Sequence, residues 1–226
     1  MSQFDRKKVI SYYYEEVYKR VWSSNPILAM SERFMESLVP PMSKNRLEIG
    51  GGSGQHLKFI KNWPSSSYVL LDPIDTKMNE KSALIRKFPG LRFVKASAEN
   101  IPFRDNFFDH TLATCVLSHV EDTLQVCREI KRVTKTGSEI LLQLPTDPGF
   151  FNLLTKKFFT YPKINSISNF PADLIYALDH RNSIQNILSI IKYVFKDDQI
   201  KVYYLPFFMK SVNFNLLCVV KIKNIT

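Results

Sequence analysis

The glycines between residues 50 and 54 lie where a strand-like run passes into a helix-like run. Gly50, Gly52 and Gly54 alternate along the chain, so the backbone can turn sharply and approach a ligand without an intervening Cβ. A second strand-like run ends at Asp72, about 20 residues further on, where an acid can accept hydrogen bonds from two ribose hydroxyls. The combination predicts that a cofactor containing a nucleoside binds at this turn.

The spacing of these residues distinguishes between cofactors. Gln55 occupies the position of the third glycine in a dinucleotide-binding turn, and His56 follows where a phosphate-binding loop requires Ser or Thr. Glu48 precedes the first glycine by two residues, so its carboxylate should repel a pyrophosphate and attract an ammonium or a sulfonium. S-adenosyl-L-methionine carries both positive groups and a ribose for Asp72, and it is the cofactor that we predict.

Four segments resemble one enzyme family. Residues 47–54, Leu-Glu-Ile-Gly-Gly-Gly-Ser-Gly, resemble the first motif of class I S-adenosylmethionine-dependent methyltransferases. Residues 98–109 resemble a stretch of the methyltransferase type 11 group, which includes the ubiquinone/menaquinone C-methyltransferases, and residues 117–122 and 128–133 continue the match. The resemblance covers roughly positions 44–145 and implies an enzyme that transfers a methyl group from S-adenosylmethionine.

Two positions depart from the pattern of this family. The family has an acid before the Ala-Glu pair, which holds the adenine amino group, whereas this chain has Ser97. Adenine recognition would then depend on the Ser97 hydroxyl and on backbone groups. The Pro-Gly-Gly turn of the family reads Thr136-Gly137-Ser138 here, which changes the turn chemistry and not the catalysis.

Composition and length indicate an ordinary globular protein. The chain has 226 residues, of which 45% are hydrophobic and 23% charged, enough for one domain or for a domain with a cap. The three cysteines form no Cys-x-x-Cys pair, so we expect buried, reduced thiols and a cytoplasmic location. The polar start, residues 1–8, predicts no signal peptide, and no apolar run approaches the ~20 residues of a membrane span. Membrane association would be at most peripheral.

The positive charge is concentrated in the last third of the chain. The net charge is +10, and residues 151–226 hold ten lysines and arginines against four acids. This excess favours an anionic partner, such as a nucleotide-sugar, a phospholipid surface or nucleic acid. A solvated, lysine-rich face is the alternative. No feature of the sequence indicates an oligomeric state.

Strand-like and helix-like runs alternate along the chain, which predicts an α/β fold: a Rossmann-like, doubly wound, seven-stranded and mostly parallel sheet. The expected strands are Arg46–Ile49, Tyr68–Leu71, Leu91–Ala96, His110–Thr114, Ser138–Leu144, Gln199–Leu205 and Asn213–Lys221, with one of the last two antiparallel. The expected helices are one or two within 4–39, with Asp5 as a cap and Pro26 as a start, and then Gln55–Trp63, Met78–Phe88, Asp122–Thr134 and Ser183–Phe195.

We expect a single methyltransferase domain over residues 1–226. Its parts are N-terminal helices (1–43), a cofactor-binding core (44–145), a cap insertion (145–182), and a last helix with closing strands (183–226). Prolines and aromatic residues alternate in the insertion, which follows the carboxyl end of the fifth strand, on the ligand side of the sheet. We therefore interpret it as a helical, aromatic cap over the active site. The alternative is an insertion that packs its aromatic side chains into the core.

The residues expected to bind the cofactor follow the carboxyl ends of the first four strands. Glu48 is expected near the methionine end, Gly50 and Gly52 beneath it, and Asp72 on the ribose. The remaining candidates are Pro73 as a wall of the adenine pocket, Ser97, Ala98 and Glu99 at its edge, and Thr114 on the methionine side.

Methyl transfer from a sulfonium is an in-line displacement with a neutral leaving group, so a base is required only where the acceptor is protonated. His119 follows the fourth strand and is a candidate base, and its alternative is a structural hydrogen bond within the loop. His180 is the second candidate, with Asp179 to orient it and Arg181 to pair with a carboxylate or phosphate of the acceptor. Its alternative is a solvated helix start.

The remaining candidates have weaker signals. Tyr13 lies among three consecutive tyrosines that resemble residues closing over the site in this group, although a helix face packed on the sheet is the alternative. His56 is expected to contact the methionine carboxylate or to pack, and His110 is expected in the core. No group of Cys, His and Asp has metal-ligand spacing, so we predict no metal.

These features predict a methyltransferase that acts on a small molecule, possibly anionic: a sugar or polysaccharide precursor, a lipid, or a quinone-like ring. An RNA-directed methyltransferase is one alternative, although residues 114–117 lack the Asn/Asp-Pro-Pro-aromatic turn of amino-group methylation of adenine, so a nucleic-acid partner is disfavoured. The other alternative is a non-catalytic protein that binds the cofactor and regulates a partner.

Overall fold

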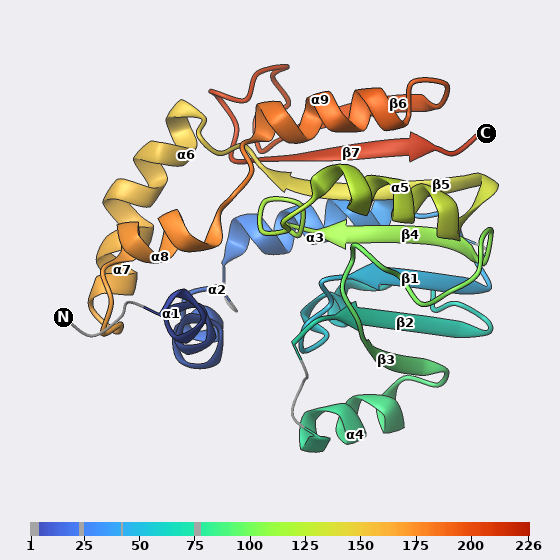
Figure 1. Ribbon diagram of the computed structural model, residues 1–226, viewed down its shortest axis with the longest axis horizontal. Helices are drawn as coiled ribbons and strands as arrows, with labels where there is room; N and C mark the ends of the chain where they lie inside the picture. The colour runs from blue at the N-terminus through green and yellow to red at the C-terminus, as the bar shows by residue number, and fades with distance from the viewer. Residues whose placement is uncertain (1–4, 23–24, 42, 75–77) are drawn as a thin grey trace.

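The strands of the computed structural model, which describes residues 5–22, 25–41, 43–74 and 78–226, form one seven-stranded sheet in the order β3-β2-β1-β4-β5-β7-β6 (Figure 1). β7 is antiparallel to both of its neighbours, and the other adjacent pairs are parallel. This is the predicted sheet. Its strands are β1 (Asn45–Ile49), β2 (Ser67–Asp72), β3 (Leu91–Lys95), β4 (Phe108–Thr114), β5 (Thr134–Pro145), β6 (Gln199–Leu205) and β7 (Leu217–Lys223).

The strand boundaries differ most from the predicted ones at β5 and β7. β5 begins at Thr134, immediately after the preceding helix, rather than at Ser138. β7 begins at Leu217 rather than at Asn213, because the preceding residues form a loop organised by the buried side chain of Asn215. That side chain accepts a hydrogen bond from the Phe207 N–H and donates to the Met209 carbonyl.

The helices begin at residues that can cap them. Asp5 and Asn25 accept hydrogen bonds from backbone N–H groups of the helices that follow, as predicted for Asp5, and Ser183 caps the last helix. The helices before β4 are α1 (Arg6–Tyr12), the π-helix η1 (Tyr13–Val17), α2 (Tyr18–Trp22), α3 (Pro26–Leu38), the 3₁₀-helix η2 (Gln55–Phe59) and α4 (Met78–Lys87). Those after β4 are α5 (Thr123–Val133), α6 (Phe150–Thr155), the π-helix η3 (Lys156–Thr160), α7 (Tyr161–Asn165), α8 (Ala172–Asp179) and α9 (Ile184–Val194).

The predicted helix Gln55–Trp63 is wrong. Only the 3₁₀-helix η2 forms, and the backbone is extended from Ile60. Pro64 disfavours helical backbone at Trp63, and Gly54 enters the turn in the left-handed conformation, so too few residues remain for a full helix.

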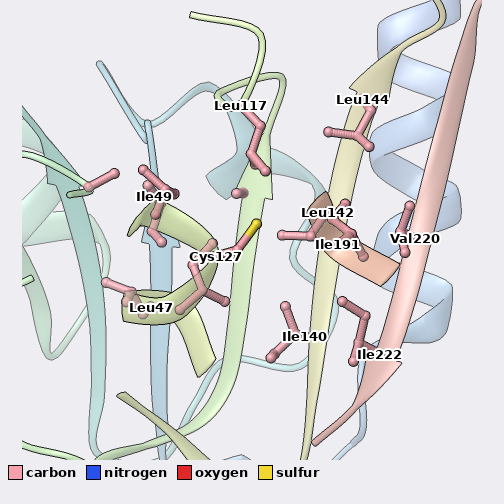
Figure 2. Close-up of a cluster of buried hydrophobic side chains, with 14 of the residues drawn as sticks. Leu47, Ile49, Leu117, Cys127, Ile140, Leu142, Leu144, Ile191, Val220 and Ile222 are labelled. Carbon is pink, nitrogen blue, oxygen red and sulfur yellow. The ribbon is translucent and has the colours of Figure 1, made fainter. Parts of the chain in front are cut away.

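Successive side chains along the central strands point to opposite faces of the sheet, which divides the core into two layers. On one face, Leu47 and Ile49 point toward α5, where Cys127 is buried, and Ile140, Leu142, Val220 and Ile222 continue this layer to α9 (Figure 2). The other face packs on α3 through Met35, Leu112, Leu141 and Val219. The sheet is therefore covered on both sides, and its carboxyl edge remains for a ligand.

The N-terminal helix and the cap form a helical lobe, which we define as residues 6–22 and 150–179. Val9, Tyr13, Val17 and Val21 pack against Ile164, Ala172, Ile175 and Tyr176. The lobe lies beyond the carboxyl ends of the parallel strands (Figure 1). The alternative in which the tyrosines pack on the sheet is therefore wrong, because the cap supplies their apolar partner. None of the helices in the described ranges has the length and hydropathy to cross a membrane.

Candidate active site

The glycine turn after β1 adopts conformations that other residues rarely adopt. Gly50, Gly52 and Gly54 have φ values of 72°, 46° and 73°. A Cβ on Gly50 would lie 2.1 Å from Cγ2 of Val116, in the loop after β4. The turn therefore needs glycine at position 50 for two reasons, positive φ and close approach.

Asp72 joins the end of β2 to the glycine turn. Its Oδ2 accepts a hydrogen bond from the Gly52 N–H at 3.0 Å, and its Oδ1 accepts one from the Ile74 N–H at 2.8 Å. Burial raises the pKa of the Asp72 carboxyl, and these two hydrogen bonds oppose that shift. A Cβ on Gly52 would lie 3.9 Å from Asp72 Oδ2, so the missing side chain leaves space directly in front of the carboxylate. The contact of Asp72 with the ribose of the cofactor remains a prediction.

Glu48 lies on the opposite face of the sheet from the neighbouring Leu47 and Ile49. Its side chain is buried, with 1% of the residue exposed, and it accepts a hydrogen bond from the Tyr68 hydroxyl at 2.8 Å. Burial raises the pKa of the Glu48 carboxyl to about 7, although the charge of His56 and the Tyr68 hydrogen bond lower it. The carboxylate therefore lies beneath the turn, between the sheet and α3, rather than open to the ligand as we expected.

His56 belongs to the same buried group. Its ring nitrogens pair with Glu32 and, at 3.0 Å, with Glu36. Burial lowers the pKa of His56, but the opposing effect of these two carboxylates is larger. The net pKa of His56 is therefore well above the usual value. Of the two interpretations of His56, this arrangement agrees with packing beneath the turn. His110 is fully buried in β4, as expected.

The candidates for the adenine side follow β2 and β3. Pro73 is exposed directly after Asp72, and Ala98 is buried. The Ser97 hydroxyl donates to the Glu99 carboxylate, which also accepts a hydrogen bond from the Glu121 N–H at 3.2 Å. Burial raises the pKa of Glu99, but these hydrogen bonds outweigh it and the net pKa is lowered. Glu99 thus links this turn to the loop after β4, and the contacts of these residues with adenine remain predictions.

The loop after β4 connects the glycine turn to the candidate bases. We call the region around these bases the acceptor side. Thr114 is half-buried at the strand end, and Cys115 turns the chain with a φ of 55°. Val116 then lies against Gly50, and its carbonyl accepts a hydrogen bond from the His119 N–H at 2.9 Å. One short loop therefore contacts the cofactor turn and carries a candidate base.

Two histidine–carboxylate pairs meet at this loop. His119 Nδ1 lies 3.3 Å from Asp179 Oδ2, and His180 Nδ1 lies 3.2 Å from Asp147 Oδ2. The two rings meet edge to face with their centroids 4.7 Å apart. The fold thus brings both predicted bases together. Asp179 pairs with His119 and not with His180, so the predicted pairing is wrong, because α8 turns these neighbouring side chains in different directions.

Asp147, the partner of His180, was not among the predicted site residues. Its signal was available, because an acid two residues beyond β5 lies on the ligand side of the sheet. Asp147 also pairs with the buried Lys156. Burial raises the pKa of Asp147, but His180 and Lys156 lower it to about 2, so the group is a carboxylate at neutral pH.

The two histidines have pKa values shifted in opposite directions. Burial lowers the pKa of His119, but the hydrogen bond and charge of Asp179 outweigh it, and the net pKa is raised. Burial also lowers the pKa of His180, and the charges of His119 and Lys156 lower it further against the effect of Asp147. Of the two rings, His180 is therefore the more readily neutral and His119 the more readily protonated.

Tyr14, rather than Tyr13, reaches these pairs. The Tyr14 hydroxyl donates to Asp179 at 3.2 Å, whereas Tyr13 is buried and accepts a hydrogen bond from the Trp22 indole at 2.9 Å. Tyr13 and Tyr14 are consecutive residues of helical backbone, so their side chains point to different sides of the helix. Arg181 follows α8 and forms an ion pair at 2.8 Å with Glu121, an exposed acid of the loop after β4.

Three of these side chains also have the donors of a metal site. The ligand atoms of His119, Asp179 and His180 lie within 4.8 Å of one another. The prediction that no metal-ligating group exists rested on spacing in the sequence, and it did not consider residues that folding brings together. Lys156 next to His180 opposes a cation, because its charge lowers the pKa of both histidines.

Comparisons with known proteins agree on one class. Residues 47–142 match a family model described as a methyltransferase domain. The chain is 27% identical over 208 residues to the uncharacterized protein MJ1123 of Methanocaldococcus jannaschii, covering 89% of this chain and 92% of that protein. It is 31% identical over 141 residues to the ubiquinone/menaquinone biosynthesis C-methyltransferase UbiE of Rickettsia bellii, covering 57% of both.

A shorter match joins the chain to an uncharacterized methyltransferase of Mycobacterium tuberculosis, with 31% identity over 103 residues, 46% of this chain and 40% of that protein. The chain thus spans about half the length of these last two relatives. Among solved structures, the N-methyltransferase NodS of Bradyrhizobium japonicum, in complex with S-adenosyl-L-homocysteine, gives a TM-score of 0.66 at 10% identity over 98% of this chain and 99% of that one. A Thermotoga maritima S-adenosylmethionine-dependent methyltransferase gives 0.64 at 18% identity over 97% and 100%.

The sheet order, the glycine turn and the acid after β2 define the class I S-adenosylmethionine-dependent methyltransferases. Residues 47–142 carry the methyltransferase domain of the type 11 family within that class, and UbiE of Rickettsia bellii is among the distant relatives of the chain.

Proposed function

We propose that this methyltransferase acts on a hydroxylated small molecule, with His180 as the general base. The observation that carries the proposal is the meeting of the pairs His119–Asp179 and His180–Asp147 on the acceptor side of the sheet. S-adenosylmethionine, when bound, supplies a methyl group activated by a sulfonium. Gly50, Gly52, Asp72, Pro73, Ser97, Ala98, Glu99 and Thr114 are the residues that we propose hold it, with Glu48 buried beneath the glycine turn as their support.

The histidines supply the proton transfer that a hydroxyl acceptor requires. Neutral His180 removes the hydroxyl proton, and the Asp147 carboxylate, 3.2 Å from Nδ1, stabilises the imidazolium that results. His119, whose pKa is raised by Asp179, places positive charge near the developing oxyanion when it is protonated. An amine acceptor that is already neutral needs no such base, so two half-buried histidines favour a hydroxyl or an enol carbon over nitrogen.

The surroundings of the histidines favour an acceptor with an aromatic or lipid-like part. The Tyr176 ring centroid lies 4.8 Å from that of His180, and Lys156 Nζ lies 4.3 Å from the centroid of Tyr176. Tyr14 adds a second aromatic ring on the opposite side of Asp179. Aromatic rings together with a buried ammonium suit a phenol or quinol with an anionic oxygen better than they suit a bare sugar.

Formation of adenosylhomocysteine tests this proposal. The probes are phenols, hydroquinones, hexose phosphates and aliphatic amines, each incubated with the purified chain and S-adenosylmethionine. For the best hydroxylated acceptor, we expect His180→Ala to lower kcat by roughly 100-fold to 10,000-fold, because the base is lost, with a change of less than about threefold in the affinity for S-adenosylmethionine.

Lys196→Ala is the matched control, because Lys196 lies after α9, outside the residues assigned to the site, and it should turn over at the parent rate. Methylation confined to amines, or a His180→Ala variant within threefold of the parent on a hydroxylated acceptor, would overturn the assignment.

One observation favours the RNA-directed alternative. Arg128, Lys131, Arg132 and Lys196 line a groove between α5 and α9. Lys131 and Arg132 are already paired with Asp198 and Asp105, which weakens the groove as an anion site. RNA binding that falls steeply with salt and is lost in Arg128→Ala would support this alternative. Failure of every acceptor to produce adenosylhomocysteine would instead support a non-catalytic, regulatory role.

A further inference from the structure

Large hydrophobic side chains are exposed along two short segments. Among the described residues, the α6–η3 segment exposes Phe150, Leu153, Phe158 and Phe159, and the loop between β6 and β7 exposes Phe207, Phe208, Met209 and Phe214. We call these eight residues the aromatic face. Phe159 is 74% exposed and Phe158 is 62% exposed, so these rings lie in water rather than at the edge of the core. Soluble monomers seldom expose so much contiguous apolar surface without a partner.

The start of the α6–η3 segment contacts the loop between β6 and β7. The Phe151 N–H donates to the Asn213 carbonyl at 3.0 Å, and the Phe150 N–H donates to the Asn213 side chain at 3.3 Å. The Phe151 ring lies 6.0 Å from both Phe207 and Phe214, measured between centroids. In the ribbon, α6 and the loop that leads to β7 likewise lie at the same corner of the molecule (Figure 1).

The loop of the aromatic face is held in its displayed form. The side chain of Asn215 is fully buried and donates to the carbonyls of Met209 and Ser211, both at 2.8 Å. Phe208 has a φ of 58°, a left-handed conformation that is costly for a bulky residue. A loop that is tied to a buried amide and still exposes three consecutive large apolar side chains is organised for contact with a partner.

The segments that carry the aromatic face contain lysines and no acids. Residues 148–172 and 199–226 contain no Asp or Glu, and Lys157 and Lys210 lie next to the exposed aromatic residues in the sequence. Lys157 Nζ lies 5.9 Å from the centroid of Phe158, so a cation borders the exposed rings directly. Aromatic rings bordered by lysines, without acids, are typical of surfaces that bind the interface of anionic membranes.

A second copy of this chain fits the aromatic face less well. A two-fold dimer would bring the face against itself, because the same patch is used on both subunits. Lysines would then approach lysines, and the acid-free segments would offer no carboxylate to pair with them. An anionic bilayer supplies both the apolar interior and the negative charge.

We propose that the aromatic face docks this methyltransferase on the surface of an anionic bilayer, with its aromatic rings at the depth of the headgroups and its lysines on the lipid phosphates. The same α6–η3 segment carries Lys156 into the acceptor side through Asp147. Docking would therefore bring the cap, and the acceptor side beneath it, toward the lipid. This proposal goes beyond the proposed function and does not depend on the assignment of His180.

Co-sedimentation with vesicles tests the docking directly, without acceptor or methyl donor. The full chain is mixed with vesicles of phosphatidylcholine alone, or of phosphatidylcholine with phosphatidylglycerol. We expect binding to the anionic vesicles, weaker binding to the neutral ones, and loss of the difference at high salt. Phe158→Ser/Phe159→Ser and Phe207→Ser/Phe208→Ser should each lower the partition coefficient by roughly tenfold or more, since two aromatic anchors are removed.

Tyr193→Ser is the matched control, because Tyr193 is also a largely exposed aromatic residue but belongs to α9, outside the aromatic face. It should bind as the parent does, and all variants should keep the parent melting temperature and S-adenosylmethionine affinity. Absence of binding to anionic vesicles, or equal binding by the double variants, would overturn the proposal. Dimerisation in the absence of lipid that the double variants abolish would also overturn it and would assign the face to a second copy.

Discussion

At the scale of single residues, Glu48 is a buried acid within a group of polar side chains beneath the glycine turn. It accepts one hydrogen bond from Tyr68, lies near protonated His56, and is enclosed between the sheet and α3. Its pKa is raised to about 7, chiefly by burial, against roughly 4.3 in an unfolded chain. A raised carboxyl pKa means that its contribution to the free energy of unfolding is most favourable at low pH and is lost as pH rises toward 7 and above.

Glu48→Gln should therefore have an effect on stability that depends on pH. Gln can still accept the Tyr68 hydrogen bond, and it carries no charge to bury. We expect the free energy of unfolding of the variant, relative to the parent, to rise between pH 5 and pH 8 by on the order of 1 to 3 kcal/mol. Urea unfolding at both values measures it. A relative stability that is flat or falls over this range would show that Glu48 is charged without penalty in the folded protein.

The two histidines show which parts of a site can be located from the sequence and which depend on folding. His119 and His180 could be named because each follows an element that ends on the ligand side of the sheet. Their partners were not assigned, because Asp147 and Asp179 pair with them across 33 and 60 positions of sequence, after the segment 150–179 has folded back. Tyr13 was named in place of Tyr14 for a similar reason, since one residue of rotation along a helix changes the face.

At the scale of elements, the strands were predicted well and the irregular helices were not. Period-two alternation and β-branched runs located β1 to β6 within a few residues, because each central strand packs on both faces. The π-helical turns η1 and η3 and the 3₁₀-helix η2 depend on tertiary contacts, such as the lobe packing of Tyr13, and not on a local repeat. The start of β7 was misplaced because Asn215, and not a turn motif, sets the end of the loop.

The turn between β1 and η2 supports a prediction about the cofactor. Gly50→Ala adds a Cβ that would lie 2.1 Å from Val116 and also forces an L-residue into positive φ. We expect the dissociation constant for S-adenosylhomocysteine to rise by roughly tenfold or more, because the turn or the Val116 loop must move. Isothermal titration calorimetry measures it.

Gly137→Ala separates strain from collision, because Gly137 has a φ of 83° but no atom within 4 Å of its added Cβ. It should lower stability by about 1 kcal/mol while leaving the dissociation constant unchanged. Val116→Ala in the Gly50→Ala background should recover part of the affinity. An unchanged dissociation constant in Gly50→Ala would mean that the turn does not contact the cofactor.

At the scale of the whole molecule, two of the apolar clusters of the described residues differ in composition. One lies in the sheet with α5 and α9 (Figure 2), and the other lies in the helical lobe between α1 and α8. The lobe cluster contains fewer buried aliphatic side chains than the sheet cluster, and several tyrosines. Within the lobe, Arg6 of α1 donates two hydrogen bonds, at 2.7 and 3.0 Å, to the Leu178 carbonyl of α8. Segments with fewer buried contacts open at lower free energy than the global unfolding.

Hydrogen exchange should therefore be faster in the lobe than in the sheet. We expect amides of α1 and α8 to exchange faster than those of β4 and β5. In Arg6→Ala, exchange in α8 should accelerate by roughly tenfold, because two hydrogen bonds to one carbonyl are lost, while β4 is unchanged. Lys8→Ala on the same helix is the matched control, since Lys8 is exposed, and it should leave α8 as in the parent. Equal acceleration of exchange in α8 and β4 of Arg6→Ala would show that the lobe and the sheet open as one unit, and would contradict the prediction.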